Sequence, residues 1–416
     1  MTPLRIALAG LVALAVAMGI GRFAFTPIMP MMLHDGGVDL QRASWLASTN
    51  YLGYLVGALL CTFDPWLRRR LGRHKPADGP AIVRHGLAAT ALLTLAMALP
   101  WPATWPTLRF AAGVVSAYVL LHSSGWCLAQ LAARGAPSLG GVMFAGPGAG
   151  IIASGLLGSA MVVWQWRASA AWIAFGLLAA LLTAAVWQVF RRENELALQA
   201  SAEPSAAATT PSPSASASPP HGKAEVGVLA FAYGIAGFGY IVTATFLPVI
   251  ARAAVPGSPL IDLFWPIFGG GVVCGALLSA RIGAAIDRRR LLASAYVVQA
   301  VGIGLGVAWP TEAGFAVGSL LLGFPFTTLT LFALQEARRI RPHAATPTMG
   351  LITTVWALGQ ALGPAMVSGL LRLSDGDAHA AFQRSLLIAA TALLLGAALF
   401  MASAQAWPAR APGRAA

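Results

Sequence analysis

The chain is dominated by long apolar runs that are separated by short polar segments. A helix needs about 20 apolar residues to cross a hydrocarbon layer of roughly 30 Å. Runs of this length occur twelve times, six in each half of the chain. We therefore predict an all-α membrane protein with twelve transmembrane helices, at about 6–33, 44–64, 82–101, 107–132, 140–163, 168–190, 226–250, 260–282, 291–309, 313–335, 347–371 and 383–404.

The two sets of runs are separated by a segment rich in alanine, serine and proline. Such a segment cannot bury a core and is typical of a flexible linker. We therefore predict an N-terminal six-helix bundle over 1–190, a disordered linker over 191–223, a C-terminal six-helix bundle over 224–404 and a tail over 405–416.

Composition and charge agree with a membrane protein. Hydrophobic residues make up 57% of the chain and charged residues only 10%, against roughly 25% charged residues in soluble domains. The net charge of +13 would favour a nucleic-acid partner if the basic residues formed a patch, but they lie in the short loops. With the N-terminus inside, twenty of the 27 basic residues face the cytoplasm and five face the other side. The positive-inside rule then predicts a multi-pass protein of the inner membrane, with both termini and the linker in the cytoplasm.

The first run also has features of a secretory signal peptide. Arg5 precedes it, and Ala15-Val16-Ala17 offers a candidate cleavage site. The run nevertheless stays apolar to Leu33, and its second half recurs later in the chain. We therefore expect a retained first helix.

An internal repeat relates the two halves. Gly19-Ile20-Gly21-Arg22-Phe23 aligns with Gly234-Ile235-Ala236-Gly237-Phe238 at an offset of 215 residues. The Gly53/Gly57 and Gly271/Gly275 pairs align at an offset of 218, and Gly146-Pro147 and Gly363-Pro364 at 217. The GxxxG pairs permit close helix packing. Two parallel six-helix repeats are an arrangement found in secondary transporters, with the substrate between them near the midplane.

On these motifs the sequence resembles the major facilitator superfamily over the whole chain. The stretch GIGRFAFTPIMPMM in the first run and AYGIAGFGYIVTATFLPVIAR in the seventh resemble the YbfB/YjiJ-type group within it. The resemblance implies the major facilitator fold, in which helices 1, 4, 7 and 10 line a central cavity.

Three further motifs resemble those of the superfamily. The loop 283–288 resembles its G-x-x-x-D-R motif, which implies a gating role for Asp287 and Arg288. The equivalent loop after the second run departs from the motif, because Asp64 comes early and arginines follow it. The stretch from Arg109 to Gly113 resembles the R-x-x-x-G motif, often linked to proton coupling. Residues 146–150 resemble an antiporter bend, except that Ile151 replaces its last glycine.

Arg22 is the only charged residue of the first run. An arginine at a membrane-helix centre costs about 2.5–3.5 kcal/mol on insertion scales, so it normally faces a wet cavity or a partner. All fourteen acidic residues fall in loops or at the ends of runs, so no carboxylate in a run neutralises Arg22 or Arg109. Because a guanidinium matches a carboxylate, we predict that both arginines bind an anionic substrate. Alternatively, Arg22 braces backbone carbonyls near Pro27, and Arg109 reaches the outer surface.

Other polar residues within runs are weaker candidates. His122 could carry a coupling proton, although a hydrogen-bonded core histidine is the simpler alternative. Four further residues are predicted substrate contacts, each of which could instead serve helix packing or interhelical hydrogen bonding: Tyr233, Tyr240, Asn50 and Gln360.

These features together predict a secondary transporter of a small organic anion, such as a monocarboxylate, driven by a proton or substrate gradient. No metal cluster, nucleotide-binding loop or catalytic constellation is evident, so we expect neither an enzyme nor a bound cofactor. One alternative is a proton-coupled exporter of drugs or amphiphilic cations. Another is a receptor or scaffold that does not transport. We expect a monomer.

Overall fold

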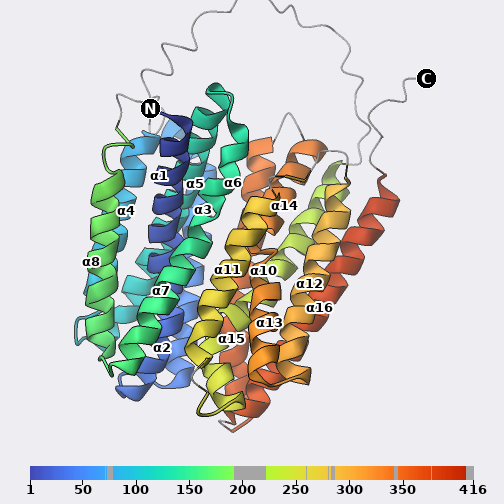
Figure 1. The fold of residues 1–416 in the computed structure, drawn as a ribbon. Helices are drawn as coiled ribbons and strands as arrows, with labels where there is room; N and C mark the ends of the chain where they lie inside the picture. Colours follow the sequence, from blue (N-terminus) through green and yellow to red (C-terminus); the bar gives the residue numbers. More distant parts are fainter. Residues whose placement is uncertain are drawn as a thin grey trace, which may run out of the picture.

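The computed structural model describes residues 1–70, 72, 78–191, 222–258, 260–279, 281–282, 286–341, 345–375 and 377–408. Most of the predicted linker and the end of the predicted tail lie outside these residues. The helices run nearly parallel to one another in two groups (Figure 1). The N-terminal group, in blue and green, lies on the left of this view, and the C-terminal group, in yellow to red, on the right.

The first span of the N-terminal group is built from three consecutive segments, α1 (Pro3–Leu14), the π-helical segment η1 (Ala15–Phe23) and α2 (Phe25–His34). The rest of the group comprises α3 (Leu40–Arg70), α4 (Gly79–Ala96), α5 (Trp105–Ala133), α6 (Gly140–Phe144), α7 (Gly146–Val163) and α8 (Ala168–Val186). The C-terminal group comprises α10 (Gly222–Ala254), α11 (Phe264–Ser279), α12 (Arg288–Ala308), α13 (Glu312–Gly323), α14 (Phe326–Ile340), α15 (Ala345–Leu373) and α16 (Ala378–Ala406).

Within the described residues, eleven helices are long and apolar enough to cross a membrane, against the twelve that the sequence predicts. The difference concerns the predicted span 82–101, which corresponds to α4. This helix packs against α5 and α8 as a member of the bundle, but its 18 residues include Arg84 and His85, which lower its hydropathy. Large apolar side chains cover the outer surface, and Leu181 and Leu395 are 68% and 61% exposed. Such a surface suits contact with lipid, and the all-helical membrane fold agrees with the sequence prediction.

The internal repeat is visible in the packing of its glycines. A Cβ on Gly53 would lie 2.0 Å from the carbonyl oxygen of Phe110 in α5. A Cβ on Gly271, the counterpart of Gly53 at an offset of 218 residues, would lie 2.5 Å from the carbonyl oxygen of Leu320 in α13. Both GxxxG pairs therefore bring helices together within a bundle and not between bundles.

The two bundles meet along two pairs of long helices. α3 packs against α15, and α7 packs against α11. α7 and α11 lie next to each other in the middle of Figure 1. Polar contacts cross this interface. The hydroxyls of Tyr51 and Thr245 lie 3.1 Å apart, and the Thr26 hydroxyl donates to the carbonyl of Ala244 at 3.1 Å. The first span therefore contacts the C-terminal bundle directly.

Candidate functional site

The centre of the interface is organised by the π-helical segment η1. π-helical turns are rare and occur frequently at functional sites. Glycine permits the segment to approach its neighbour closely, because a Cβ on Gly19 would lie 2.4 Å from the Cα of Gly150 in α7. Arg22 lies near the end of this segment and is only 1% exposed. The local backbone thus places a charged side chain in the interior of the molecule.

The Arg22 guanidinium contacts both bundles. Its Nη2 donates to Oε1 of Gln360 in α15 at 3.0 Å, and its Nη1 lies 3.7 Å from the sulfur of Met18. Its central carbon lies 4.0 Å from the ring centroid of Tyr54 in α3, a cation–π geometry. No ion pair joins Arg22 to a carboxylate in the described part of the chain.

One edge of the Arg22 guanidinium is only partly satisfied. The Nε–H and one Nη2–H point along the same edge, which is one of the edges that binds a carboxylate with two parallel hydrogen bonds. Here Nη2 has the amide oxygen of Gln360 as its acceptor, whereas the buried Nε has no hydrogen-bond partner. The arrangement therefore has one acceptor where a carboxylate would supply two.

Arg109 in α5 holds the backbone of η1. Its Nη1 and Nη2 donate to the carbonyl oxygens of Gly21 and Arg22, each at 3.2 Å, and its guanidinium lies 4.7 Å from the ring centroid of Phe25. The side chain is 2% exposed, so it does not reach the outer surface. Arg109 therefore has the carbonyl-bracing geometry that the sequence offered as an alternative for Arg22. Asn50 in α3 extends this bracing, because its amide donates to the carbonyl of Arg109 at 2.8 Å.

Gln360 links Arg22 to a row of aromatic rings. Its Nε2 donates to the hydroxyl of Tyr240 in α10. The Tyr240 ring stacks on Trp356 with centroids 5.4 Å apart, and Trp356 stacks on Tyr233 at 4.5 Å. The Tyr233 hydroxyl donates to Thr330 at 3.0 Å. Four of the six predicted substrate contacts thus form one connected group: Arg22, Gln360, Tyr240 and Tyr233. The other two, Arg109 and Asn50, bond the backbone next to this group.

Sequence reasoning did not single out Tyr51 and Tyr54, which complete the surroundings of Arg22. Their ring centroids lie 5.2 Å and 4.0 Å from the Arg22 guanidinium carbon. Because the two residues are three apart in a helix, they share a face. A pair of tyrosines at this spacing in an apolar run was the available signal.

His122 lies apart from this group. It is in α5, thirteen residues after Arg109, and its ring stacks on Tyr118 with centroids 6.0 Å apart. Its Nδ1 lies 3.9 Å from the position that a Cβ on Gly79 would take, at the start of α4. The structure therefore places His122 against α4, within the N-terminal bundle.

The loop before α12 belongs to a cluster of charges at one end of the C-terminal bundle. The guanidinium of Arg289 is fully buried and contacts the carboxylates of Asp287 at 2.9 Å, Glu336 at 3.3 Å and Glu225 at 3.4 Å. Arg339 pairs with Glu225 and Glu336. The cluster therefore joins α10, α12 and α14.

Within this cluster Asp287 pairs with Arg289, the residue that follows the arginine of the motif. The Arg288 guanidinium lies 5.3 Å from the ring centroid of Phe332. Burial acts to raise the pKa of Asp287, but hydrogen bonds from Arg289 and the charges of Arg289 and Arg339 outweigh it, so the pKa is lowered below its ordinary value. Asp287 is therefore a carboxylate at neutral pH, and a gating role for this loop stays a prediction.

The described residues contain no group of three or more His, Cys, Asp or Glu side chains that could hold a metal ion. The groups gathered around Arg22 are a guanidinium, an amide and tyrosine side chains, which offer hydrogen bonding and charge.

Comparisons with known proteins agree with this architecture. Residues 14–401 match the family described as uncharacterised MFS-type transporter YbfB. No match is found among curated proteins. Among solved structures, a crystal structure of a mutant of the nucleoside transporter NupG is similar in fold, with a TM-score of 0.65 and 13% sequence identity over 96% of this chain and 99% of that chain. Family and fold together point to a transporter, with a small-molecule substrate and a membrane environment. The chain belongs to the YbfB family of MFS-type transporters, within the major facilitator superfamily that its sequence resembles.

Proposed function

We propose that this chain is a secondary active transporter of a small organic anion, such as a monocarboxylate, and that Arg22 is the residue that binds the anion. The observation that carries the proposal is a buried guanidinium at the contact between the bundles, with no described carboxylate within ion-pair distance. A charge in this position without a counter-ion is costly unless a ligand supplies one.

The geometry of Gln360 supports an exchange of partners. A substrate carboxylate could accept from both Nε and Nη2 of Arg22 and displace the single neutral acceptor that Gln360 provides. Gln360 and Tyr240 belong to the C-terminal bundle, so a bound anion would be contacted from both sides. Binding between two bundles is the general requirement of alternating access.

The roles of the other predicted residues follow from their positions. Arg109 holds the π-helical segment, and Asn50 bonds the backbone of Arg109, so both act as positioning residues for Arg22. Tyr233 lies two stacked rings away and would contact only a larger substrate. His122 is the proposed proton carrier, because an imidazole titrates near neutral pH. The proposed location is the inner membrane, with both termini and the linker in the cytoplasm.

The proposal is tested by the thermal stability of the purified protein in the presence of a panel of ligands. The panel contains carboxylates, lipophilic cations and, because NupG is a nucleoside transporter, nucleosides as neutral compounds. Carboxylates should raise the Tm of the native protein but not that of Arg22→Gln. Arg134→Gln is the matched control, because it removes one positive charge at the end of α5, where the guanidinium donates to Gln130 of the same helix. Stabilisation by cations alone would refute the anion proposal and favour the exporter alternative.

A second experiment tests the coupling role of His122. Uptake of the stabilising carboxylate into proteoliposomes is measured with and without an imposed pH gradient. His122→Ala should transport without responding to the gradient. If it responds like the native protein, the coupling proton is carried elsewhere.

A further inference from the structure

A cavity lies in the N-terminal bundle, and Arg22 is not among the residues that line it. Its volume is about 1050 Å³, which is at the upper end of ordinary ligand pockets. It is formed by the end of α2, the end of α4, the start of α5 and the connection from α7 to α8. These segments lie at the end of the molecule opposite the start of α1 and the end of α16 (Figure 1). None of the site residues that the sequence predicts is among the residues that line this cavity.

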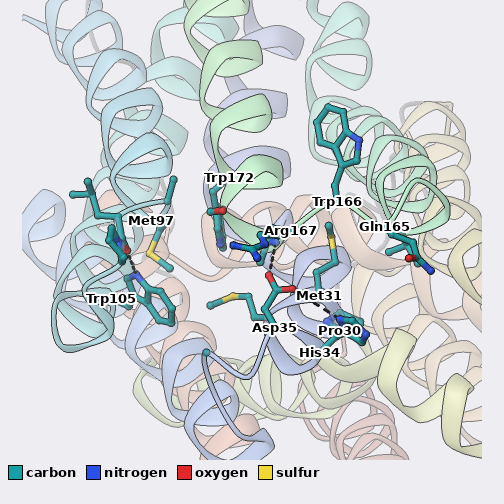
Figure 2. A pocket seen from close by; sticks show the side chains of 18 of the residues that line it. Pro30, Met31, His34, Asp35, Met97, Trp105, Gln165, Trp166, Arg167 and Trp172 are labelled. Carbon is teal, nitrogen blue, oxygen red and sulfur yellow. Dashed lines mark hydrogen bonds and ion pairs between the residues drawn. The ribbon is translucent and has the colours of Figure 1, made fainter.

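The polar groups of this cavity include donors without acceptors. Trp172 is 2% exposed, and its indole Nε1 is buried without a hydrogen-bond partner. A buried donor left unpaired is unfavourable, and native structures rarely keep one without a reason. The Arg167 side chain also makes no hydrogen bond or ion pair with any described residue. In Figure 2 both residues lie above Asp35.

The one carboxylate that faces the cavity is already engaged. Oδ2 of Asp35 accepts from the backbone N–H of Ala168 at the start of α8, at 2.7 Å. Its other oxygen lies 3.9 Å from Nδ1 of the exposed His34. Arg252 also lines the cavity but is paired with Asp262. The buried polar atom of the described lining that lacks a partner is therefore a donor, and a ligand that satisfies it must bring an acceptor.

The remaining wall is apolar and adaptable. Met31 and Met97 line it, and flexible thioethers fit ligands of varied shape. Trp105 also lines the cavity, and its indole N–H already donates to the carbonyl of Leu99 at 3.1 Å, so the ring offers only its apolar faces. In Figure 2 Met97 and Trp105 form the left side of the cavity.

We infer that this cavity is a binding site for an amphipathic organic anion, separate from the Arg22 site. The acidic head accepts hydrogen bonds from Nε1 of Trp172 and from the guanidinium of Arg167, and the apolar body lies against Met31, Met97 and Trp105. The same chemistry is offered by a free organic acid and by an anionic lipid, whose head carries a phosphate. The inference does not depend on the proposed function, because binding here requires no transport.

Calorimetric titration tests this inference on the full chain in nanodiscs of phosphatidylcholine. The probes are 4-phenylbutyrate and its amide, which share an apolar body and differ in the charge of the head. The acid should bind and the amide should bind at least tenfold more weakly. Trp172→Phe keeps the ring and removes the N–H, so it should weaken binding of the acid roughly five- to tenfold. Arg167→Gln should weaken it at least as much.

Two variants serve as controls, and the Tm of every variant is measured to show that it is folded. Trp126→Phe removes another buried indole N–H without a partner, packed on Phe190, and should leave binding unchanged. Arg22→Gln should also retain this binding, even if transport is lost. Equal binding of acid and amide, an equal loss in Trp126→Phe, or native binding in Trp172→Phe would overturn the inference. Loss of all binding in Arg22→Gln would also overturn it, by placing the probe at the centre.

A second arm identifies the source of the ligand. The titration is repeated in nanodiscs that contain phosphatidylglycerol. One outcome is that the anionic lipid lowers the affinity of the native protein for 4-phenylbutyrate and leaves the weaker affinity of Arg167→Gln for the same probe unchanged. In that case the occupant of the cavity in the membrane is a lipid. If the anionic lipid has no effect on either affinity, the site takes free organic acids. Either result is consistent with an anion site in this cavity.

Discussion

Replacement of Arg289 by methionine tests the charge cluster at the end of the C-terminal bundle. The guanidinium is fully buried and contacts three carboxylates, and it also donates to the carbonyls of Ser403 and Trp407 at 3.0 and 2.7 Å. Removal of one partner from a buried ion pair costs about 3–5 kcal/mol. Because Arg339 still pairs with Glu225 and Glu336, we expect a value near the lower end, about 3 kcal/mol.

Differential scanning fluorimetry of the purified protein measures this effect. One kcal/mol corresponds to about 2–4 °C in a domain of this size, so Arg289→Met should lower the Tm by roughly 6–12 °C. Arg290→Met is the matched control, because it removes a neighbouring arginine that is exposed and makes no side-chain hydrogen bond or ion pair with any described residue. Surface substitutions of this kind usually change stability by less than about 0.5 kcal/mol, so the control should lose less than about 2 °C. An equal or larger loss in Arg290→Met would refute the assignment of Arg289 as the partner of Asp287.

Three further predictions concern the same bundles. Gly275→Ala places a Cβ 1.7 Å from a backbone oxygen and should cost about 1–3 kcal/mol of stability, whereas Gly304→Ala, where no atom lies within 4 Å, should not lower the Tm. The Tm difference between the native protein and Asp287→Asn should be constant above about pH 5 and should vanish as the pH falls below about 4. The reason is that a carboxyl group with a lowered pKa stabilises the folded state only while it is ionised. A Tm difference that grows on acidification would contradict the ion pair. Arg109→Lys cannot bond the carbonyls of Gly21 and Arg22 as a planar fork does, so hydrogen exchange in residues 15–23 should become faster, and unchanged exchange would exclude the bracing role.

The sequence was sufficient to predict the fold because membrane helices are recognised by the length and apolar composition of their segments. The ends of most predicted spans fall within a few residues of the observed helices. The predicted span that is missing from the eleven apolar helices is α4, and it carries Arg84 and His85. The π-helical form of η1 was not predictable, because it depends on contacts that close around it, such as that of Gly19 with Gly150.

The candidate site was partly predictable. A lone arginine in an apolar run singled out Arg22, which lies buried at the contact between the bundles. Its role in binding a substrate stays a prediction. The sequence could not say which arginine braces the backbone and which contacts the C-terminal bundle, because that depends on how α3, α5 and α15 pack on the first span. It also could not choose among the consecutive arginines 288–290. Only the direction of each side chain from α12 shows that Arg289 points inward.

Substrate exchange in proteoliposomes tests the central proposal most directly. Vesicles loaded with the carboxylate that gives the largest rise in Tm are diluted into buffer containing a trace of its radiolabelled form, and accumulation of label is followed. Loss of a charged pair at a binding site costs at least about 2 kcal/mol, or roughly thirtyfold in Kd. The native protein and Arg134→Gln should accumulate label, and Arg22→Gln should accumulate none above empty vesicles. Accumulation by Arg22→Gln at the native rate and concentration dependence would show that Arg22 does not bind the substrate.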